Sequence, residues 1–266
     1  MPGNHHDGEG DFPTRGRQDI AAALADLQKD GVTAIGDVIP ASVVCSLCDD
    51  FSDRYGKYLN EDLKTTDAQD SGSRLVSRVG DRRYMITTEL SGAFGDPSVY
   101  ANPTIMAVVE EALGADFILE NFGVVTSLPG AEPQSRHRDG PMLFDTGISA
   151  ILPAHAFTVV IPLVEMNAES GSTTVWPGTH RSMVWEEGAK SVSPLVREGA
   201  CIIWDYRLFH AGAANRSRSV RPIVYLTYAR RWFQDPGNFN GKDRLLLSAE
   251  SRGNVPDEYR HLFAHI

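Results

Sequence analysis

The sequence has few cysteines, three in 266 residues, which is too few for a disulfide framework. This scarcity is typical of proteins that fold in a reducing compartment, so we expect a cytoplasmic location. No apolar run approaches the roughly 18 residues that cross a bilayer, and we expect no membrane span. Residues 1–16 are polar and Gly-rich. They lack the apolar centre of a signal peptide and are predicted to be a disordered tail.

Positive charge is also scarce. Lys and Arg number 25 against 35 Asp and Glu, so the formal net charge is -10. Nucleic acids and anionic membrane surfaces need clustered basic residues, and the charge balance argues against both as partners. We therefore expect a small molecule as the binding partner, and a monomer or a homodimer as the oligomeric state. The hydrophobic content of 42% is ordinary for a globular protein, and a chain of this length can form one domain with a sizeable core.

Two of the cysteines, Cys45 and Cys48, form a Cys-x-x-Cys pair. They lie in a segment where Val44, Leu47 and Phe51 recur at helical spacing. A redox pair requires this motif at a helix N-terminus in a thioredoxin-like setting. We therefore interpret the two as half-buried residues of a helix.

The order of elements predicts helices first and strands afterwards. Apolar spacing predicts helices from residue 17 to 30, from 40 to 58 and over 103–113, with one strand over 32–39. Short strands separated by Pro and Gly turns follow, and they predict a β sandwich or barrel. These strands are 117–128, 156–164, 172–176, 199–204 and 221–231. The layout is one domain over 17–266, with a helical part (17–116), a β core (117–232) and a C-terminal extension (233–266).

His137 and Asp139 begin the chemistry-bearing part of the chain. In an extended strand, positions i and i+2 project from the same face, so an imidazole and a carboxylate can point at one spot. That pair is half of a metal site. Asp139-Gly140 is also a turn signal, so the metal interpretation depends on a further ligand.

His210 is the candidate third ligand, because it follows the apolar strand 199–204. The other histidines lie in the tail, in turns or near the C-terminus: His5, His6, His155, His180, His261 and His265. Two histidines and one carboxylate leave open metal positions, which is typical of non-haem Fe(II) oxygenases. An α-keto acid cosubstrate needs a cation for its far carboxylate, and Arg221 is the candidate. Arg216 and Arg218 compete with it, although both lie in a predicted turn.

Four motifs in order make the chain recognisable. They are Gln134-x-x-His137-x-Asp139-Gly140, then Glu169–Arg181 with its Pro-Gly-Thr-His, then Asp205–Asn215 with His210-Ala-Gly, and finally Arg221. Over residues 17–232 the sequence resembles the phytanoyl-CoA dioxygenase family of Fe(II)/2-oxoglutarate-dependent oxygenases. The resemblance implies a mainly β fold with flanking helices, whose core is a double-stranded β-helix, a cupin-like jelly roll.

The resemblance also implies roles for individual residues. His137, Asp139 and His210 match the iron ligands, and Arg221 matches the arginine that pairs with 2-oxoglutarate. Thr173 and Gln134 match residues that support the cosubstrate. The implied cofactors are Fe(2+), 2-oxoglutarate and O2.

The segment 141–155 follows the metal ligands directly, and we expect it to cover the substrate pocket. The candidate pocket residues are apolar: Met142, Leu143, Phe144 and Trp232. They favour a small, largely apolar metabolite as substrate, which fits natural-product biosynthesis. Arg83 could also reach the pocket, and Asp205 could orient a histidine or pair with Arg207.

The predicted activity is oxidation of that metabolite, by hydroxylation or else by desaturation or ring formation, with release of succinate and CO2. Two alternatives belong to other classes. A non-catalytic jelly-roll binding protein would have degraded metal ligands. A cupin-type metal enzyme without a keto acid would tolerate loss of Arg221.

Overall fold

The computed structural model describes residues 12–56, 59, 75–239 and 243–265. Eight strands form one major sheet in the order β1-β2-β8-β6-β10-β5-β4-β3. All neighbouring strands in it are antiparallel except β1 and β2. The strands are β1 (Thr14–Arg15), β2 (Val32–Ile35), β3 (Val76–Gly80), β4 (Arg83–Thr87), β5 (Phe117–Ser127), β6 (Ala156–Pro162), β8 (Cys201–Asp205) and β10 (Arg221–Arg230).

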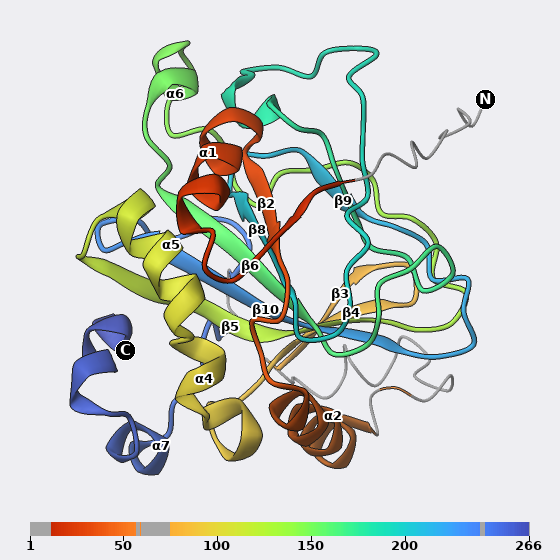
Figure 1. The fold of residues 1–266 in the computed structure, drawn as a ribbon, viewed down its shortest axis with the longest axis vertical. Helices are drawn as coiled ribbons and strands as arrows, with labels where there is room; N and C mark the ends of the chain where they lie inside the picture. Colours follow the sequence, from red (N-terminus) through yellow and green to blue (C-terminus); the bar gives the residue numbers. More distant parts are fainter. Residues whose placement is uncertain (1–11, 57–58, 60–74, 240–242, 266) are drawn as a thin grey trace.

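A smaller sheet forms the second layer. Strands β7 (Thr173–Val175) and β9 (His210–Gly212) pair antiparallel in it. Single bridges widen it on both sides, from His137 to His210 and from Val175 to Val192. The fold is therefore mainly β with flanking helices and a jelly-roll core, as predicted (Figure 1).

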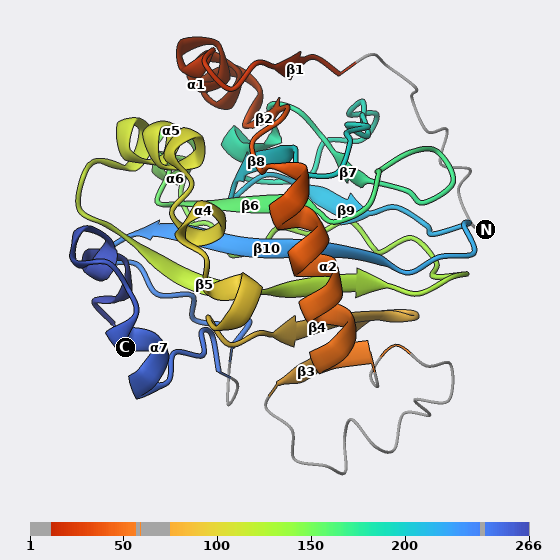
Figure 2. The ribbon, with the colours of Figure 1, turned by 60° about the horizontal axis from the view of Figure 1, so that its bottom comes forward.

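The helices cover the outer face of the major sheet, and Figure 2 shows α2, α4 and α5 lying across that face. Alternation along β10 explains why. Val224, Leu226 and Tyr228 join the core cluster that contains helix residues, while Ile223 and Tyr225 line a cavity on the inner face. The helices and 3-10 turns are α1 (Ile20–Asp30), α2 (Ala41–Tyr55), η2 (Gly92–Gly95), α4 (Pro97–Tyr100), α5 (Pro103–Leu113), α6 (Ile148–Ile151), η3 (Thr179–Arg181), α7 (Ala249–Gly253) and η4 (Asp257–Phe263).

Local signals explain where the predicted helices start and stop. Gly31 adopts a left-handed φ of 75° and ends α1. The side chain of Asn102 accepts hydrogen bonds from the backbone N–H groups of Thr104 and Ile105, and Pro103 opens α5. The three long helices and the five predicted core strands are present, with boundaries shifted by up to three residues.

The N-terminal part differs from the prediction in two ways. The predicted tail extends too far, because Thr14–Arg15 form β1 and the Arg15 guanidinium binds the Asp26 carboxylate at 2.7 Å. The region 17–116 contains more strand than the one predicted at 32–39, because it supplies β3 and β4 as well as β2 to the major sheet. Residues 1–11 lie outside the described part of the chain.

The cysteine prediction was half right. Cys48 is half-buried on α2, whereas Cys45 is exposed on the same helix. Within residues 12–56, 59, 75–239 and 243–265, no helix combines the length and hydropathy that crossing a membrane would require.

Candidate active site

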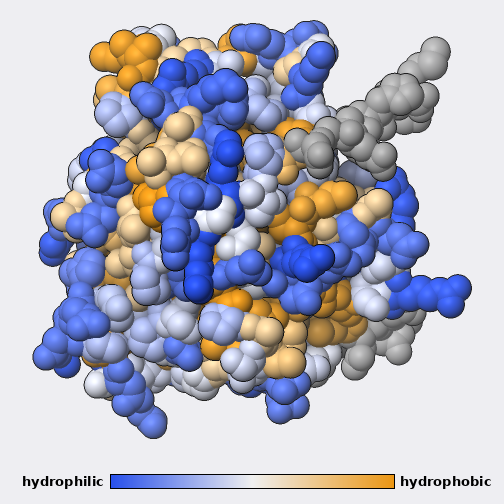
Figure 3. All heavy atoms as spheres, viewed as in Figure 1, coloured by the Kyte–Doolittle hydropathy of each residue, from blue (hydrophilic) through white to orange (hydrophobic). Residues whose placement is uncertain are grey.

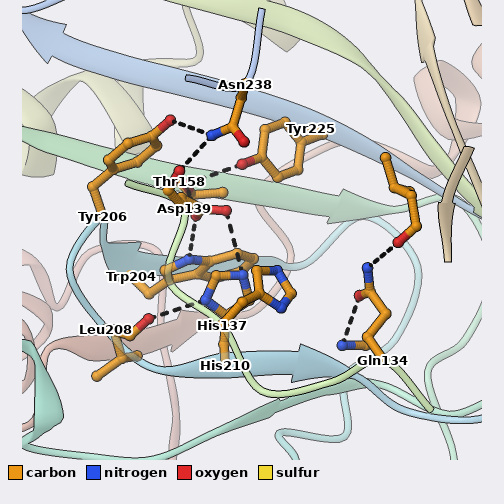
Figure 4. A network of polar contacts seen from close by, with 12 residues as sticks. Gln134, His137, Asp139, Thr158, Trp204, Tyr206, Leu208, His210, Tyr225 and Asn238 are labelled. Atoms are coloured by element: carbon orange, nitrogen blue, oxygen red, sulfur yellow. Dashed lines mark hydrogen bonds and ion pairs between the residues drawn. The ribbon is translucent and has the colours of Figure 1, made fainter. Parts of the chain in front are cut away.

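The ligand atoms of His137, Asp139 and His210 lie within 4.8 Å of one another. Strand pairing brings them together across 73 residues of sequence. The backbone N–H of His137 donates to the carbonyl of His210 at 2.9 Å, and the reverse bond is 2.8 Å. The two imidazoles contact one another with centroids 4.4 Å apart and ring planes tilted by 57°. Asp139 follows two residues later and turns its carboxylate toward the same point (Figure 4).

Backbone carbonyls orient both imidazoles. Nδ1 of His137 lies 2.8 Å from the carbonyl oxygen of Ser135, and Nδ1 of His210 lies 3.0 Å from that of Leu208. These contacts place the proton on Nδ1 and leave the Nε2 lone pair of each ring free for a metal.

The carboxylate of Asp139 is oriented in the same way. Its Oδ2 accepts hydrogen bonds from Thr158 Oγ1 at 2.6 Å and from Trp204 Nε1 at 2.9 Å. These donors are directly paired residues of β6 and β8. The other oxygen, Oδ1, faces His210 Nε2 at 3.4 Å. One oxygen is thus held by the sheet and the other is presented to the site (Figure 4).

The electrostatics of the triad favour an ionised Asp139 and a neutral His137, whereas the pKa of His210 is raised, because the adjacent Asp139 outweighs its burial. Burial lowers the pKa of His137, and the facing His210 lowers it further. Burial alone would raise the pKa of Asp139, but the adjacent His210 and the hydrogen bonds outweigh it and keep that pKa below its usual value. A carboxylate and neutral imidazoles are the forms that bind a divalent cation. Two histidines and one carboxylate with open positions fit Fe(II).

A second cluster lies across the cavity on the major sheet. In the sheet register Ser127 on β5 pairs with both Arg221 on β10 and Arg83 on β4. Arg221 donates to Ser127 Oγ at 3.0 Å, and Arg83 Nη1 donates to the same oxygen. In the described part of the chain, the remaining partners of both guanidinium groups are backbone carbonyls. Register alone therefore places two cations side by side.

This arginine pair is suited to an anion. Burial lowers the pKa of Arg221 to about 9, with a smaller contribution from Arg83, and burial lowers the pKa of Arg83 to about 10. Both stay charged at neutral pH. Within the described residues, the buried Nε of each arginine has no hydrogen-bond partner. A carboxylate between them would satisfy donors that are otherwise unpaired.

The competing arginines lie elsewhere. Arg216 and Arg218 are exposed, whereas Arg221 is only 3% exposed. Among the described strands, β9, which begins at His210, pairs with β7, whereas β10, which begins at Arg221, pairs with β5 and β6. Arg221 reaches the cavity from the opposite sheet.

Gln134 and Thr173 line the same cavity. The amide of Gln134 donates to the carbonyl of Val79 at 2.7 Å and accepts from the N–H of Gly212 at 2.9 Å. A Cβ at Gly212 would come within 2.6 Å of both Arg83 Nη1 and Gln134 Oε1. A side chain at this position would therefore have to displace the ends of Arg83 and Gln134, between which β9 passes.

The cavity measures about 600 Å³ and contains the triad and both arginines. Met142, Leu143, Phe144 and Trp232 are not among its lining residues, which corrects the predicted substrate pocket. Phe144 and Trp232 are 56% and 64% exposed. The residues beyond the triad and arginines include Ser77, Val79, Met85, Thr87, Tyr225, Asn238, Phe239 and Asp243.

The course of segment 141–155 explains this displacement. Arg207 forms a buried ion pair with Asp205 at 2.7 Å. Among the described residues Asp205 thus pairs with Arg207, and it has no hydrogen bond to a histidine ring there. Arg207 also donates to the carbonyls of Ser149 and Leu152 and holds α6 on the outside. Figure 3 shows an apolar group where Figure 1 places α6, and Ile151 there is 81% exposed.

Sequence reasoning missed several site residues. The sequence provides no geometric argument for Arg83 and no signal that gives Ser127, Thr158 or Trp204 a role. Period-two alternation along the strands could have indicated inward positions, but only the register shows which of these residues meet.

A jelly roll with a metal-ligand triad, in which Asp139 and His210 are enclosed, facing a buried pair of cations defines a metal-dependent enzyme with an anionic cosubstrate. Residues 27–223 match the phytanoyl-CoA dioxygenase (PhyH) family. The chain belongs to that family, and it is an Fe(II)/2-oxoglutarate-dependent dioxygenase that uses Fe(2+), 2-oxoglutarate and O2.

Curated relatives carry the name dioxygenase. Dioxygenase trt7 of Aspergillus terreus is 26% identical over 208 residues, which cover 73% of this chain and 68% of the relative. Dioxygenase af480 of Aspergillus fumigatus is 26% identical over 193 residues, covering 68% of this chain and 58% of the relative.

Solved structures share the fold. The epimerase SnoN, in complex with Fe3+, alpha ketoglutarate and nogalamycin RO, has a TM-score of 0.62 at 17% identity and covers 86% of this chain and 93% of its own. HygX from Streptomyces hygroscopicus, with nickel and 2-oxoglutarate bound, has a TM-score of 0.61 at 14% identity, with coverages of 80% and 88%.

Proposed function

We propose that His137, Asp139 and His210 bind the Fe(II), and that Arg221 and Arg83 together bind the distal carboxylate of 2-oxoglutarate. The observation that carries this proposal is the buried arginine pair joined through Ser127, with its unpartnered Nε atoms. Thr173 and Gln134 line the space between the two clusters and are proposed as further contacts to the cosubstrate.

The residues between the clusters suit the rest of that molecule. Val125, Val160 and Ile223 line the cavity beside the arginine row and would contact the methylene groups of 2-oxoglutarate. Bound iron with 2-oxoglutarate and O2 supplies the oxidising power to functionalise a C–H bond, with release of succinate and CO2. The arginine pair would hold the distal carboxylate of 2-oxoglutarate and so fix the direction in which the cosubstrate lies in the cavity.

We propose hydroxylation of a small natural product as the reaction, with desaturation or ring closure as variants. The remaining wall of the cavity combines apolar Val79, Met85 and Phe239 with polar Ser77, Thr87 and Asp243. An amphipathic substrate with oxygen substituents matches this wall better than the largely apolar one expected from the sequence. The free state of all three cysteines supports a cytoplasmic setting, and either a monomer or a homodimer could supply the site.

Anaerobic titration tests the assignment. Fe(II) and 2-oxoglutarate together should produce a metal-to-ligand charge-transfer absorption band in the wild type and not in Asp139→Ala. Screening candidate natural products for succinate release, with mass-spectrometric detection of product, would then identify the substrate. Absence of the band from the wild type, or intact 2-oxoglutarate turnover in Asp139→Ala, would overturn the proposal.

A further inference from the structure

The loop that follows β10 folds back onto the metal-binding segment. Its centre is Asp235, which is 1% exposed. Asp235 Oδ1 accepts hydrogen bonds from the N–H groups of Gly237 and Asn238, at 2.7 and 3.0 Å. Its Oδ2 accepts from Asn238 Nδ2 at 2.7 Å and from the hydroxyl of Tyr206. One buried carboxylate therefore shapes the loop and connects it to Tyr206.

The loop is also attached on its other side. The N–H of Asp235 donates to Glu120 Oε1 at 2.9 Å, and Arg244 donates to the carbonyl of Asp235 at 2.6 Å. Arg244 also pairs with Glu120 and lies over the ring of Phe239 at 5.0 Å. Several buried or half-buried polar groups thus hold this short loop, and together they fix its position.

Asn238 connects this loop to the metal ligand. Its Nδ2 donates to the backbone carbonyl of Asp139 and lies 3.4 Å from the hydroxyl of Tyr206 (Figure 4). The sheet already holds the Asp139 carboxylate through Thr158 and Trp204. Asn238 contacts the main chain of the same residue from the opposite direction. The next residue, Phe239, lines the cavity.

We propose that Asn238 is a positioning residue, which holds the backbone of Asp139 and couples the cavity wall at Phe239 to the metal ligand. This inference rests on the proposed function, which assigns Asp139 as a metal ligand. Movement of Phe239 by a substrate would be transmitted through Asn238 to the carbonyl of Asp139. The loop is then both a wall of the substrate space and a support for the metal site.

Three variants test the coupling. Asn238→Ala removes the amide, and Asn238→Asp keeps the shape but replaces the donor with a carboxylate beside a carbonyl and Asp235. Tyr206→Phe alters the same network from the other side. Gln234→Ala is the matched control, because Gln234 is exposed on the same loop.

The first measurement is hydrogen exchange of peptides spanning residues 137–143 in the metal-free protein, which is independent of catalysis. Both Asn238 variants should exchange severalfold faster there than the wild type, and Gln234→Ala should not. The second is anaerobic Fe(II) affinity, which should fall by about 10- to 100-fold, the usual effect of losing a group that supports a ligand. Tyr206→Phe should also lower Fe(II) affinity, but by a smaller factor.

The outcomes separate this inference from the proposed function. If the wild type binds no Fe(II), the assignment of the metal site fails, whatever the exchange rates show. If the wild type binds Fe(II) but both Asn238 variants and Tyr206→Phe match it in exchange and within twofold in affinity, the positioning role is wrong. Arg221→Met should weaken 2-oxoglutarate binding while leaving exchange of 137–143 unchanged, which distinguishes the two clusters.

Discussion

Arg83 and Arg221 come from different strands and donate to the same hydroxyl oxygen of Ser127. The two buried positive charges repel one another. Loss of solvation on burial disfavours the charged forms more strongly than this repulsion does. An arrangement of this kind is destabilising unless an anion completes it. The arginine pair should therefore favour binding of the anionic cosubstrate, and it should lower the stability of the protein when no cosubstrate is bound.

Replacement of either arginine should separate these two effects. Arg221→Met should weaken 2-oxoglutarate binding by about 100-fold or more, because a desolvated charge partner is lost. Arg83→Met should weaken it less. The free protein should lose little stability, since a buried repulsion disappears. Anaerobic titration and thermal unfolding with and without 2-oxoglutarate measure the two quantities.

The exposed Arg216→Met is the control for this pair and should bind 2-oxoglutarate as the wild type does. Equal affinity in Arg221→Met and Arg216→Met would contradict the assigned site.

The two donors to Asp139 should matter for metal affinity. Thr158→Val and Trp204→Phe each remove one hydrogen bond to Oδ2 while keeping most of the side-chain volume. Each should lower Fe(II) affinity by about 10- to 100-fold, because the carboxylate loses its fixed orientation. Metal titration measures the change. Thr33→Val, a buried threonine of β2 whose hydroxyl bonds to Asp26, should leave Fe(II) affinity unchanged, and a similar loss there would argue against a specific role for the donors.

His155 should make stability depend on pH. It is 1% exposed, and burial lowers its pKa from 6.5 to about 4. Between these values the unfolded chain binds a proton that the folded protein does not. The free energy of unfolding should therefore be unaffected by this group above pH 6.5 and should decrease as the pH falls toward 4, by up to about 3 kcal/mol.

Denaturant unfolding across this pH range measures the effect. His155→Phe should flatten the slope, whereas replacement of the exposed His261 by Gln should not. An unchanged slope in His155→Phe would show that other groups cause the pH dependence.

The Asp205–Arg207 pair should dominate local stability around α6. Arg207→Met leaves a buried carboxylate without its partner and releases two backbone carbonyls. The expected loss is about 3 to 5 kcal/mol, measured by denaturant unfolding. The double variant Asp205→Asn with Arg207→Met should recover part of it. A loss below about 1 kcal/mol in the single variant would mean that the pair contributes little.

Much of the architecture could be predicted from local patterns. Helix α5 has an Asn cap, a Pro in its first turn and a Gly after its last residue, so the sequence alone predicts where it begins and ends. The apolar core strands were also predicted. Strands β3 and β4 were not, because they are short and carry Arg78, Arg83 and Tyr84 in place of an apolar run. Their membership in the sheet depends on pairing with β5.

The substrate side could not be predicted from proximity in sequence. Phe144 follows Asp139 closely, yet it faces outward because Arg207 anchors α6 from outside the cavity. Phe239 lies about one hundred residues further along and lines the cavity, because Asp235 and Asn238 bring its loop back to the metal segment.

The sequence by itself determined the spacing of His137 and Asp139, the four ordered motifs and the alternating core strands. These are local properties, since periodicity and motif chemistry act over a few residues. Only the tertiary structure decided that Ser127 joins Arg83 to Arg221, that Thr158 and Trp204 hold Asp139, and that Asn238 contacts its backbone. Each depends on strand register or a returning loop, where a shift of one residue would turn the side chains to the other face.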